Sequence, residues 1–473
     1  MADYDHLYAA IENSAYNLWL QQFSDGKLRF KLKLLVEKHM GKGVSFVAKN
    51  TMHGDLHICV PMQLVDGMRV LLRVAYNGSG QLAEEKANGE VAVLRYLKAK
   101  TTIPVPEVYY HGHADELPGG HGPFTIMQHI QCSQNLTTAL NDVDRVLDDD
   151  NSREQQPETW KKLTRLYEQV ADILLQLSQC EFSKIGALVE VAPGEWEAAA
   201  RPLTFNMYQL VKFAGVSPDD LPTNVHDDAH KYFVELAELH VKHLHAQHHD
   251  LFRTEEEGIK QYASRKLLRD LAQMSSVAEP SSQSGPFKLW CDDLRGMSVL
   301  LDDACNVVGV VDLEFSYAAP VEFAHSPPWW LAGPRPERSG SYSLREWAPR
   351  YGRRLAYFLE VLERVEQERA GEGRLRQDQM LSWRMRASWE TKDFWLHYAV
   401  RHGWALSGIY WEFLTERLCD FVWADDVEVL LQCIRELLGG EVETMMQFVR
   451  ERLEQQRVHS ATFRETQRAQ SLA

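Results

Sequence analysis

Residues 286–317 decide the fold, and their sequence is PFKLWCDDLRGMSVLLDDACNVVGVVDLEFSY. Two apolar runs, 299–301 and 307–311, flank a polar turn and together predict a β-hairpin. Asp293 lies before this hairpin and Asp312 follows it directly. Because a short hairpin returns the chain on itself, we expect both carboxylates to face one cleft.

Two carboxylates at one cleft are what phosphoryl transfer to a hydroxyl group requires. One carboxylate orients or deprotonates the attacking hydroxyl, and the other holds the magnesium ion that bridges the nucleotide phosphates. We assign the role of base to Asp293 and the role of metal ligand to Asp312. These two roles favour phosphoryl transfer to a hydroxyl group as the reaction.

This stretch resembles the catalytic region of the aminoglycoside phosphotransferase and choline kinase-like superfamily, in which a His-x-Asp loop ends in Asn and precedes a second Asp. Cys291 stands at the His position, Asp293 at the catalytic Asp and Ser298 at the metal-binding Asn. Residues 290–293 and 317–330 are similar to those of fungal members, in which Cys replaces His. The resemblance implies that Ser298 keeps an oxygen for magnesium but lacks the amide that braces the loop.

The same resemblance implies an ATP- and Mg2+-dependent O-phosphotransferase that acts on a small hydroxylated metabolite. It also implies an α+β, bilobal protein kinase-like fold with a small antiparallel β-sheet lobe and a larger, mainly helical lobe. Three divisions of the chain follow from it. We expect N-terminal helices and a nucleotide-binding β-lobe at 1–130, a helical lobe with the catalytic loop and acceptor pocket at 131–450, and a frayed tail at 451–473.

The first 130 residues have the periodicity of such a small lobe. Apolar residues at helical spacing before residue 40 predict helices. Short apolar runs between turns then predict an antiparallel sheet that one helix interrupts. The expected strands are 44–47, 58–62, 68–74 and 122–127, and the expected helix is 81–100.

Candidate nucleotide contacts lie within this lobe. In kinase-like enzymes a basic residue on a strand touches the phosphates and a helix Glu holds it. The matching residues are Arg73 on an expected strand and Glu90 on the expected helix. Met127, at the end of the last strand and beside a linker at 128–131, is also assigned to the nucleotide site.

A second stretch, HGDLH at 53–57, repeats by its letters the catalytic loop of many aminoglycoside-type enzymes. No Pro-x-Asn follows it, and it falls between two expected strands, where the family has its phosphate-covering turn. We therefore assign no chemistry to His53, Asp55 or His57. Gly54 is expected to give this turn its backbone freedom and to offer an amide to a phosphate oxygen.

Composition narrows the remaining classes of function. The chain has 473 residues and a formal net charge of -16, so nucleic acid is not an expected partner. No apolar run reaches the roughly 18 residues of a membrane span, and no signal-peptide pattern opens the chain, so a cytoplasmic location without membrane contact is expected. Seven scattered cysteines favour reduced thiols over disulfides or zinc.

The last 150 residues have helical patterns and many tryptophans. In related enzymes such helices build the acceptor pocket, so the resemblance makes Trp389, Glu390 and Trp395 candidates for substrate contact, with Glu390 available to an amine. Aromatic residues at helical spacing mostly form core, and we expect most of these to pack helix against helix. The histidines at 226–249 predict a solvated helix face rather than a zinc site.

Two alternatives to an active phosphotransferase stay open. With Ser298 in place of Asn, the chain also fits a pseudokinase-like nucleotide-binding or scaffold protein that engages a protein partner. The altered loop also fits a kinase-like fold redirected to another group-transfer reaction, in which Cys291 or Asp292 takes a new role. A nucleophilic Cys291 requires exposure and a lowered pKa.

Overall fold

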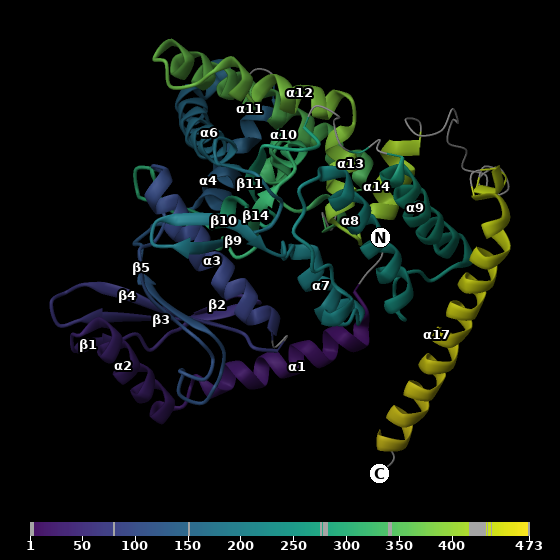
Figure 1. Cartoon of the computed structure of the whole chain (residues 1–473), viewed down its shortest axis with the longest axis horizontal. Coiled ribbons are helices and arrows are strands. Elements are labelled where there is room, and N and C mark those ends of the chain that lie inside the picture. Colours follow the sequence, from purple (N-terminus) through teal and green to yellow (C-terminus); the bar gives the residue numbers. More distant parts are fainter. Residues whose placement is uncertain are drawn as a thin grey trace.

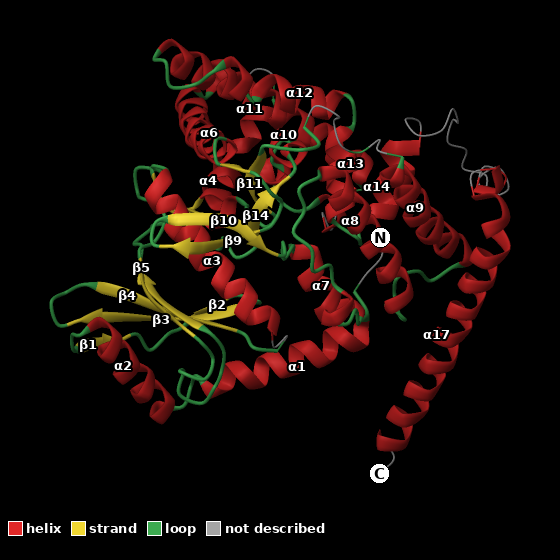
Figure 2. Cartoon of the chain, in the orientation of Figure 1, coloured by secondary structure: helices red, strands yellow, loops and turns green. Residues whose placement is uncertain are grey.

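The structure is a computed structural model, and it consists of a smaller sheet lobe and a larger helical lobe (Figures 1 and 2). It describes residues 4–78, 81–149, 152–274, 277, 282–338, 343–415, 432, 434–436 and 438–471. Across these ranges no helix combines the length and the apolar character that crossing a bilayer demands. The fold is α+β and bilobal, as the sequence predicts.

The smaller lobe is a six-stranded antiparallel sheet in the order β1-β3-β4-β6-β5, with β2 paired to β3. Its strands are β1 (Val44–Val47), β2 (Met52–His53), β3 (His57–Leu64), β4 (Arg69–Ala75), β5 (Val108–Gly112) and β6 (Phe124–Gln128). The four strands expected from the sequence are therefore confirmed to within two residues at each end. The helices of this lobe are α1 (His6–Gln22), α2 (Gly26–Met40) and α3 (Gln81–Lys100).

The alternation of side chains along β4 separates the core from the cleft. Val70, Leu72 and Val74 are fully buried and share a core with residues of α1 and α2. Because successive strand residues point to opposite faces, Leu71 and Arg73 face the other way, and both line the cavity between the lobes.

The larger lobe consists mainly of helices around short strand pairs. Its helices include α4 (Leu136–Val143), α5 (Ser152–Gln155), α6 (Pro157–Ser178), α7 (Phe205–Ala214), α8 (Ala229–Ala246), α9 (Glu255–Gln273), α10 (Val321–His325), α11 (Leu344–Gly371), α12 (Ser382–Glu390), α13 (Asp393–Arg401), α14 (Leu406–Ile409) and α17 (Val442–Ser471). Its strands are β7 (Gln134–Asn135), β8 (Glu181–Phe182), β9 (Ala187–Ala192), β10 (Glu195–Ala200), β11 (Phe287–Cys291), β12 (Val299–Leu301), β13 (Val307–Val310) and β14 (Ser316–Ala319). β12 pairs with β13 as the predicted hairpin.

Helix α1 crosses from one lobe to the other. It runs from beside α7 to the sheet lobe (Figure 1). At its start, the buried Asp5 caps the helix and accepts hydrogen bonds from the backbone and ring of His249, both at 3.0 Å. Near its end, the Trp19 indole donates to the His121 carbonyl oxygen at 2.8 Å.

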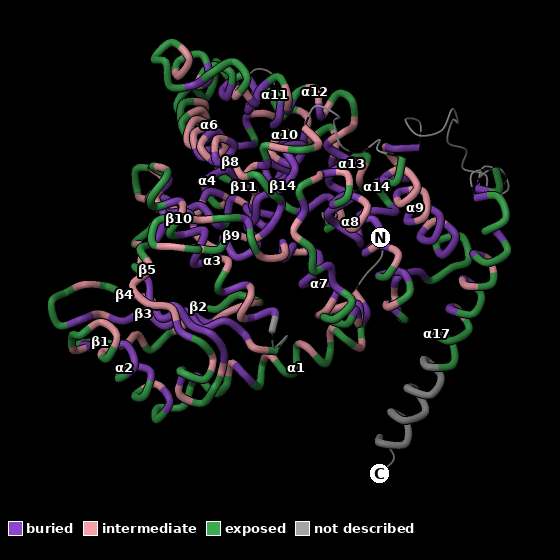
Figure 3. The backbone as a smooth tube through the Cα atoms, viewed as in Figure 1, coloured by how far each residue is buried: buried purple, intermediate pink, exposed green. Residues whose placement is uncertain are grey.

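The C-terminal tail differs from its prediction. We expected residues 451–473 to fray, but α17 continues through them to Ser471. Much of the described surface of α17 is exposed (Figure 3). Arg452 nevertheless donates to the carbonyl oxygen of His245 at 3.0 Å, so the first turns of this segment are held against the larger lobe.

The expected solvated face of the histidine-rich helix is also wrong. His240 and His243 on α8 are fully buried, because α9 and α13 pack over them. Burial lowers the pKa of His240 to about 4, and its ring contacts the Val400 carbonyl oxygen at 2.7 Å. In the described ranges no group of three or more His, Cys, Asp or Glu side chains is arranged to hold a metal.

The bridging role of α1 gives a stability prediction. Asp5→Ala removes a helix cap and leaves buried donors of His249 without an acceptor, so we expect a loss of about 3 kcal/mol in the free energy of unfolding. Asp25→Ala is the matched control, since Asp25 caps α2 at an exposed position, and it should cost about 1 kcal/mol. Urea denaturation measures both, and equal losses would contradict the bridge.

Candidate active site

Strand pairing brings the two predicted carboxylates to the same place. β11 and β14 run antiparallel with Cys291 opposite Ser316, and the Asp292 amide donates to the Phe315 carbonyl oxygen at 3.1 Å. Asp293 therefore leaves one strand close to where Asp312 and its neighbours enter the other. Both side chains line one cavity of about 800 Å³ between the lobes.

Asp312 has a backbone conformation that side chains seldom adopt. Its φ is 58°, in the left-handed region, two residues after the end of β13. The side chain is 40% exposed, and its carboxylate accepts a hydrogen bond from Arg73 at 3.1 Å. Backbone strain of this kind gathers at functional sites, where it aims a side chain.

Arg73 lies at the centre of a buried network that joins both lobes. Its guanidinium pairs with Glu90 on α3, and it also donates to Asp312 at 3.1 Å and to Glu314 at 3.3 Å. The His57 ring nitrogen lies 3.0 Å from the same guanidinium. The structure thus places Arg73 and Glu90 in contact and adds acidic partners from the larger lobe.

Three members of this network were not assigned from the sequence. They are His57, Glu314 and Lys86, whose ammonium lies 3.3 Å from Glu314. Burial raises the pKa of Glu314, but Lys86 and Arg73 outweigh burial and hold it well below the ordinary range. Burial lowers the pKa of His57 to about 4, so its ring is neutral beside Arg73. In the sequence, the available signal for Glu314 was its position two residues after Asp312.

Asp293 is held by arginines that the sequence did not point to. Its carboxylate accepts a hydrogen bond from Arg335 at 2.6 Å, and Arg295 lies at 3.6 Å. Burial raises the pKa of Asp293 above the ordinary aspartate value, against the opposing effect of Arg335. Arg335 is itself buried and lies over the rings of Phe205 and Trp329.

The other residues assigned to the nucleotide and metal sites differ in whether they line the cavity. Met127 lines the cavity beside the linker. Ser298 is only 1% exposed and is not among the residues lining the cavity, while its backbone hydrogen-bonds to Arg295 and Val311. Gly54 lines the cavity, but its amide donates to the His57 carbonyl oxygen at 3.2 Å. The Gly54 amide is therefore engaged within its own turn, and its contact with a phosphate stays a prediction.

The three candidate substrate contacts on α12 and α13 lie elsewhere. Trp389 and Trp395 belong to an aromatic cluster against α11, where Trp395 stacks on Phe413 with ring centroids 4.1 Å apart. Glu390 is exposed at the end of α12. None of the three is among the residues that line the cavity, so the structure does not bring them to Asp293.

The neighbours of Asp293 are structural. Asp292 is buried and accepts hydrogen bonds from the Trp290 indole at 2.9 Å and the Phe205 amide at 3.2 Å. Cys291 is buried, and burial raises the pKa of its thiol to about 12. This is the opposite of what a nucleophilic thiol needs, so the site does not favour the alternative that uses Cys291 as a nucleophile.

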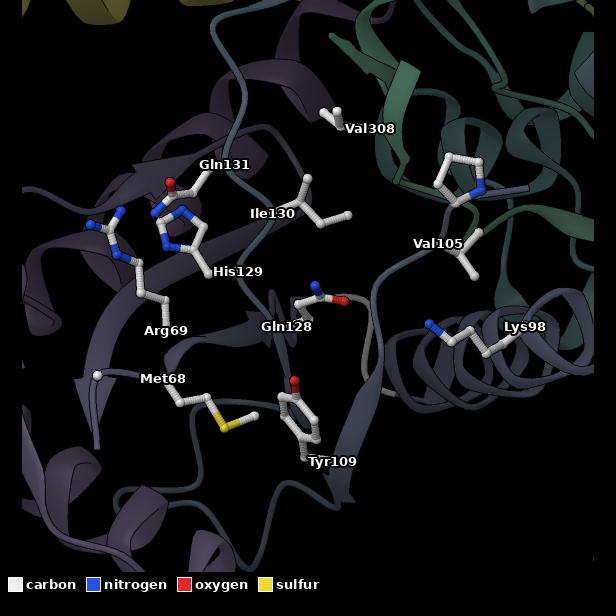
Figure 4. A pocket seen from close by; sticks show the side chains of 12 residues that line it. Met68, Arg69, Lys98, Val105, Tyr109, Gln128, His129, Ile130, Gln131 and Val308 are labelled. Carbon is white, nitrogen blue, oxygen red and sulfur yellow. The ribbon is translucent and has the colours of Figure 1, made fainter. Parts of the chain in front are cut away.

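A second hollow lies beside the interlobe linker at 128–131 (Figure 4). It has a volume of about 590 Å³, and Arg69, Lys98, Gln128 and His129 are among its lining residues. Of the described residues that line it, none carries a carboxylate. The larger cavity, which holds both aspartates, is therefore the candidate active site.

The oxygen donors of the cavity fit a magnesium ion shared with a nucleotide. Magnesium is commonly bound by one or two carboxylates together with phosphates and waters, rather than by a cage of protein ligands. Asp312 offers an exposed carboxylate, whereas Glu314 is buried against Lys86 and Arg73. Asp312 would hold the ion, and the buried Ser298 has no cavity-lining position from which to help.

Comparisons with known proteins find distant similarity to solved structures of small-molecule kinases and phosphotransferases. No model of a known protein family matches the chain. Similar solved structures include an ethanolamine kinase of Plasmodium vivax, with 12% identity, a TM-score of 0.41 and coverage of 94% of this chain and 93% of that enzyme. An aminoglycoside phosphotransferase of Alicyclobacillus acidocaldarius has 9% identity, a TM-score of 0.35 and coverage of 88% and 95%.

A curated relative is the Clavilactone A biosynthesis cluster protein Y of Ampulloclitocybe clavipes. It is 25% identical over 290 residues, which are 59% of this chain and 62% of that protein. The match thus spans less than two thirds of the relative's length. Because the TM-scores above lie below 0.5, we base the functional proposal on this chain's own residues and contacts.

The raised pKa of Cys291 gives a labelling prediction. At pH 8, Cys291 should stay protonated and resist iodoacetamide in the native protein, while the exposed Cys132 should react. Peptide mapping by mass spectrometry after brief labelling distinguishes the two sites. Labelling of Cys291 at the rate of Cys132 would contradict its burial, and labelling in urea, where both should react, is the control.

Proposed function

We propose that the protein is an ATP- and Mg2+-dependent O-phosphotransferase that acts on a small hydroxylated molecule. The observation that carries the proposal is the convergence of Asp293, Asp312 and Arg73 on one interlobe cavity. A carboxylate for the hydroxyl, an oxygen ligand for magnesium and a cation for the phosphates are the parts that such a transfer uses.

In the proposed reaction, the acceptor hydroxyl gives its proton to the Asp293 carboxylate while its oxygen forms a bond to the γ-phosphorus of ATP. The bond from that phosphorus to the bridging oxygen breaks, and ADP leaves with the electron pair. Bound magnesium supplies neutralisation of the phosphate charge. Asp293 can itself take this proton, because it is a carboxylate that lines the cavity.

Arg73 and Asp312 would exchange partners when the nucleotide binds. Among the acidic partners of Arg73, Asp312 is 40% exposed while Glu314 is 6% exposed, so Asp312 is the one able to turn toward a metal ion. Arg73 would keep Glu90 and Glu314 and present its released N–H groups to the phosphates. The guanidinium stays neutralised throughout.

A second candidate is nucleotide binding without transfer, as in a pseudokinase-like protein. The burial of Ser298 favours it, because a metal site with one protein ligand instead of two holds the phosphates less rigidly. The presence of Asp293 in the cavity favours transfer. Turnover distinguishes the two candidates.

Nucleotide binding is tested first by thermal unfolding with and without MgATP. At a concentration 100 times Kd, a ligand specific for the folded state stabilises it by about 2.7 kcal/mol, which raises the melting temperature. We expect this shift in the parent and its loss in Asp312→Asn. Asp303→Asn is the control, since Asp303 is exposed on the turn of the same hairpin. No shift in the parent, or an unchanged shift in Asp312→Asn, would count against the site.

The role of Asp293 is tested by turnover. Asp293→Asn should keep the MgATP shift and lower ADP formation by about 100-fold or more, the usual contribution of a general base. In the parent, activity should decline as pH falls through the raised pKa of Asp293, which lies above the ordinary value of about 3.9. Retained turnover in Asp293→Asn would remove the residue from the base role.

A further inference from the structure

The end of the cavity beyond Asp293 is basic and aromatic. Its lining comes from α7, from the segment η4 (Trp329–Ala332) to η5 (Pro336–Arg338), and from the residues before α1. Asp55 before β3, and Asp293 and Arg295 after β11, complete it. We call this region the acceptor end. Its aromatic residues are Tyr4, Phe205, Tyr208, Phe213, Trp329 and Trp330. The region adjoins the proposed base directly, because Arg335 lines it and contacts Asp293 at 2.6 Å.

Basic side chains outnumber acidic ones at the acceptor end. Its lining has four cations, Lys212, Arg295, Arg335 and Arg338, against the carboxylates of Asp55 and Asp293. Lys212 is neutralised by Glu12 at 2.9 Å, and Arg335 by Asp293. Arg295 shares the same Asp293 at 3.6 Å, so two guanidinium groups compete for one carboxylate.

Arg338 is the cation left without an acidic partner. In the part of the chain that the structure describes, no carboxylate lies within 4.0 Å of its guanidinium, which rests on the Tyr4 ring at 4.3 Å. The neighbouring Glu337 instead accepts the Tyr398 hydroxyl at 2.7 Å. The Arg338 amide donates to the Arg335 carbonyl oxygen at 2.9 Å in a 3₁₀ turn, and residues three apart eclipse in such a turn. Arg338 is therefore on the same side of the chain as Arg335.

We propose that the hydroxylated acceptor is an anion, with a carboxylate on a flat apolar body. The Arg338 guanidinium would take the carboxylate as a charge-assisted pair, the aromatic rings would contact the body, and the hydroxyl would reach Asp293. The carboxylate is a recognition group, and the hydroxyl oxygen is the atom that receives the phosphoryl group. An amine-bearing acceptor would meet Arg338 and Arg295 with like charge, which is unfavourable.

This assignment rests on the proposed function, and direct binding separates the two. The probes are 4-(hydroxymethyl)benzoate and 4-(hydroxymethyl)benzylamine, which share a ring and a hydroxyl and differ in charge. Calorimetry should give the benzoate a Kd lower by about tenfold or more. An equal or reversed order, or no detectable binding of the benzoate, would overturn the anionic acceptor, whereas a missing MgATP shift would overturn the phosphotransferase.

Charge reversal supplies the second arm of the test. Arg338→Glu should abolish the preference for the benzoate or reverse it, and should melt near the parent because the side chain is exposed and has no ion pair in the described ranges. Arg384→Glu is the matched control, since Arg384 also rests on an aromatic ring, Trp383 at 4.5 Å, but lies outside the cavity. A preference that survives in Arg338→Glu would overturn the role of Arg338.

Discussion

Arg73 is a buried guanidinium on the small lobe that meets carboxylates from both lobes, and the geometry of the cleft depends on it. Burying an ion costs several kcal/mol unless opposite charges and hydrogen bonds surround it. Glu90 provides an opposite charge from α3, while Asp312 and Glu314 provide opposite charges from the larger lobe. If the lobes separated, Arg73 would lose two of its three acidic partners. The network thus favours a closed cleft as well as a charged site.

Two further features hold the lobes in that relation. α1 is anchored to the larger lobe by Asp5 and to the small lobe by Trp19. α3 carries Glu90 and buries Leu94 and Leu97 in the core of the larger lobe. The helix that positions the partner of Arg73 is therefore fixed by packing outside its own sheet. Together these contacts make the end of the cavity around Arg73 largely preformed.

The local sequence pattern was enough to predict the strands, whereas long-range packing decided which side chains contact one another in the site. The strands of the small lobe and the hairpin after Asp293 follow from alternation and turn residues, which are properties of neighbouring positions. The contact of Arg335 with Asp293 joins residues 42 positions apart, across a segment without a periodic signal. His57 was set aside because its motif lay in the wrong context, although its position on β3 opposite the next strand brings its ring to Arg73.

The distinction between local pattern and long-range packing also explains where the tryptophans and histidines lie. Helical spacing showed that α8, α12 and α13 have buried faces, but it could not show which neighbour covers them. α8 is covered on both sides, so His240 is neutral and buried. Trp395 faces the aromatic cluster against α11 and not the cavity. A residue type that suits substrate contact is informative only once the element carrying it is placed in the fold.

The charges of the cavity divide it into two ends, one with an excess of acidic groups and one with an excess of basic groups. At the end around Arg73, the carboxylates of Glu90, Asp312 and Glu314 face only two cations, Arg73 and Lys86, so acidic groups are in excess there in the described ranges. At the acceptor end the excess is basic, and the exposed Arg338 has no ion pair in the described ranges. Asp293 lies between them, kept in a buried position by Arg335. A metal-bound nucleotide and an anionic acceptor would each meet the opposite charge there, with the hydroxyl and the γ-phosphate brought together at Asp293.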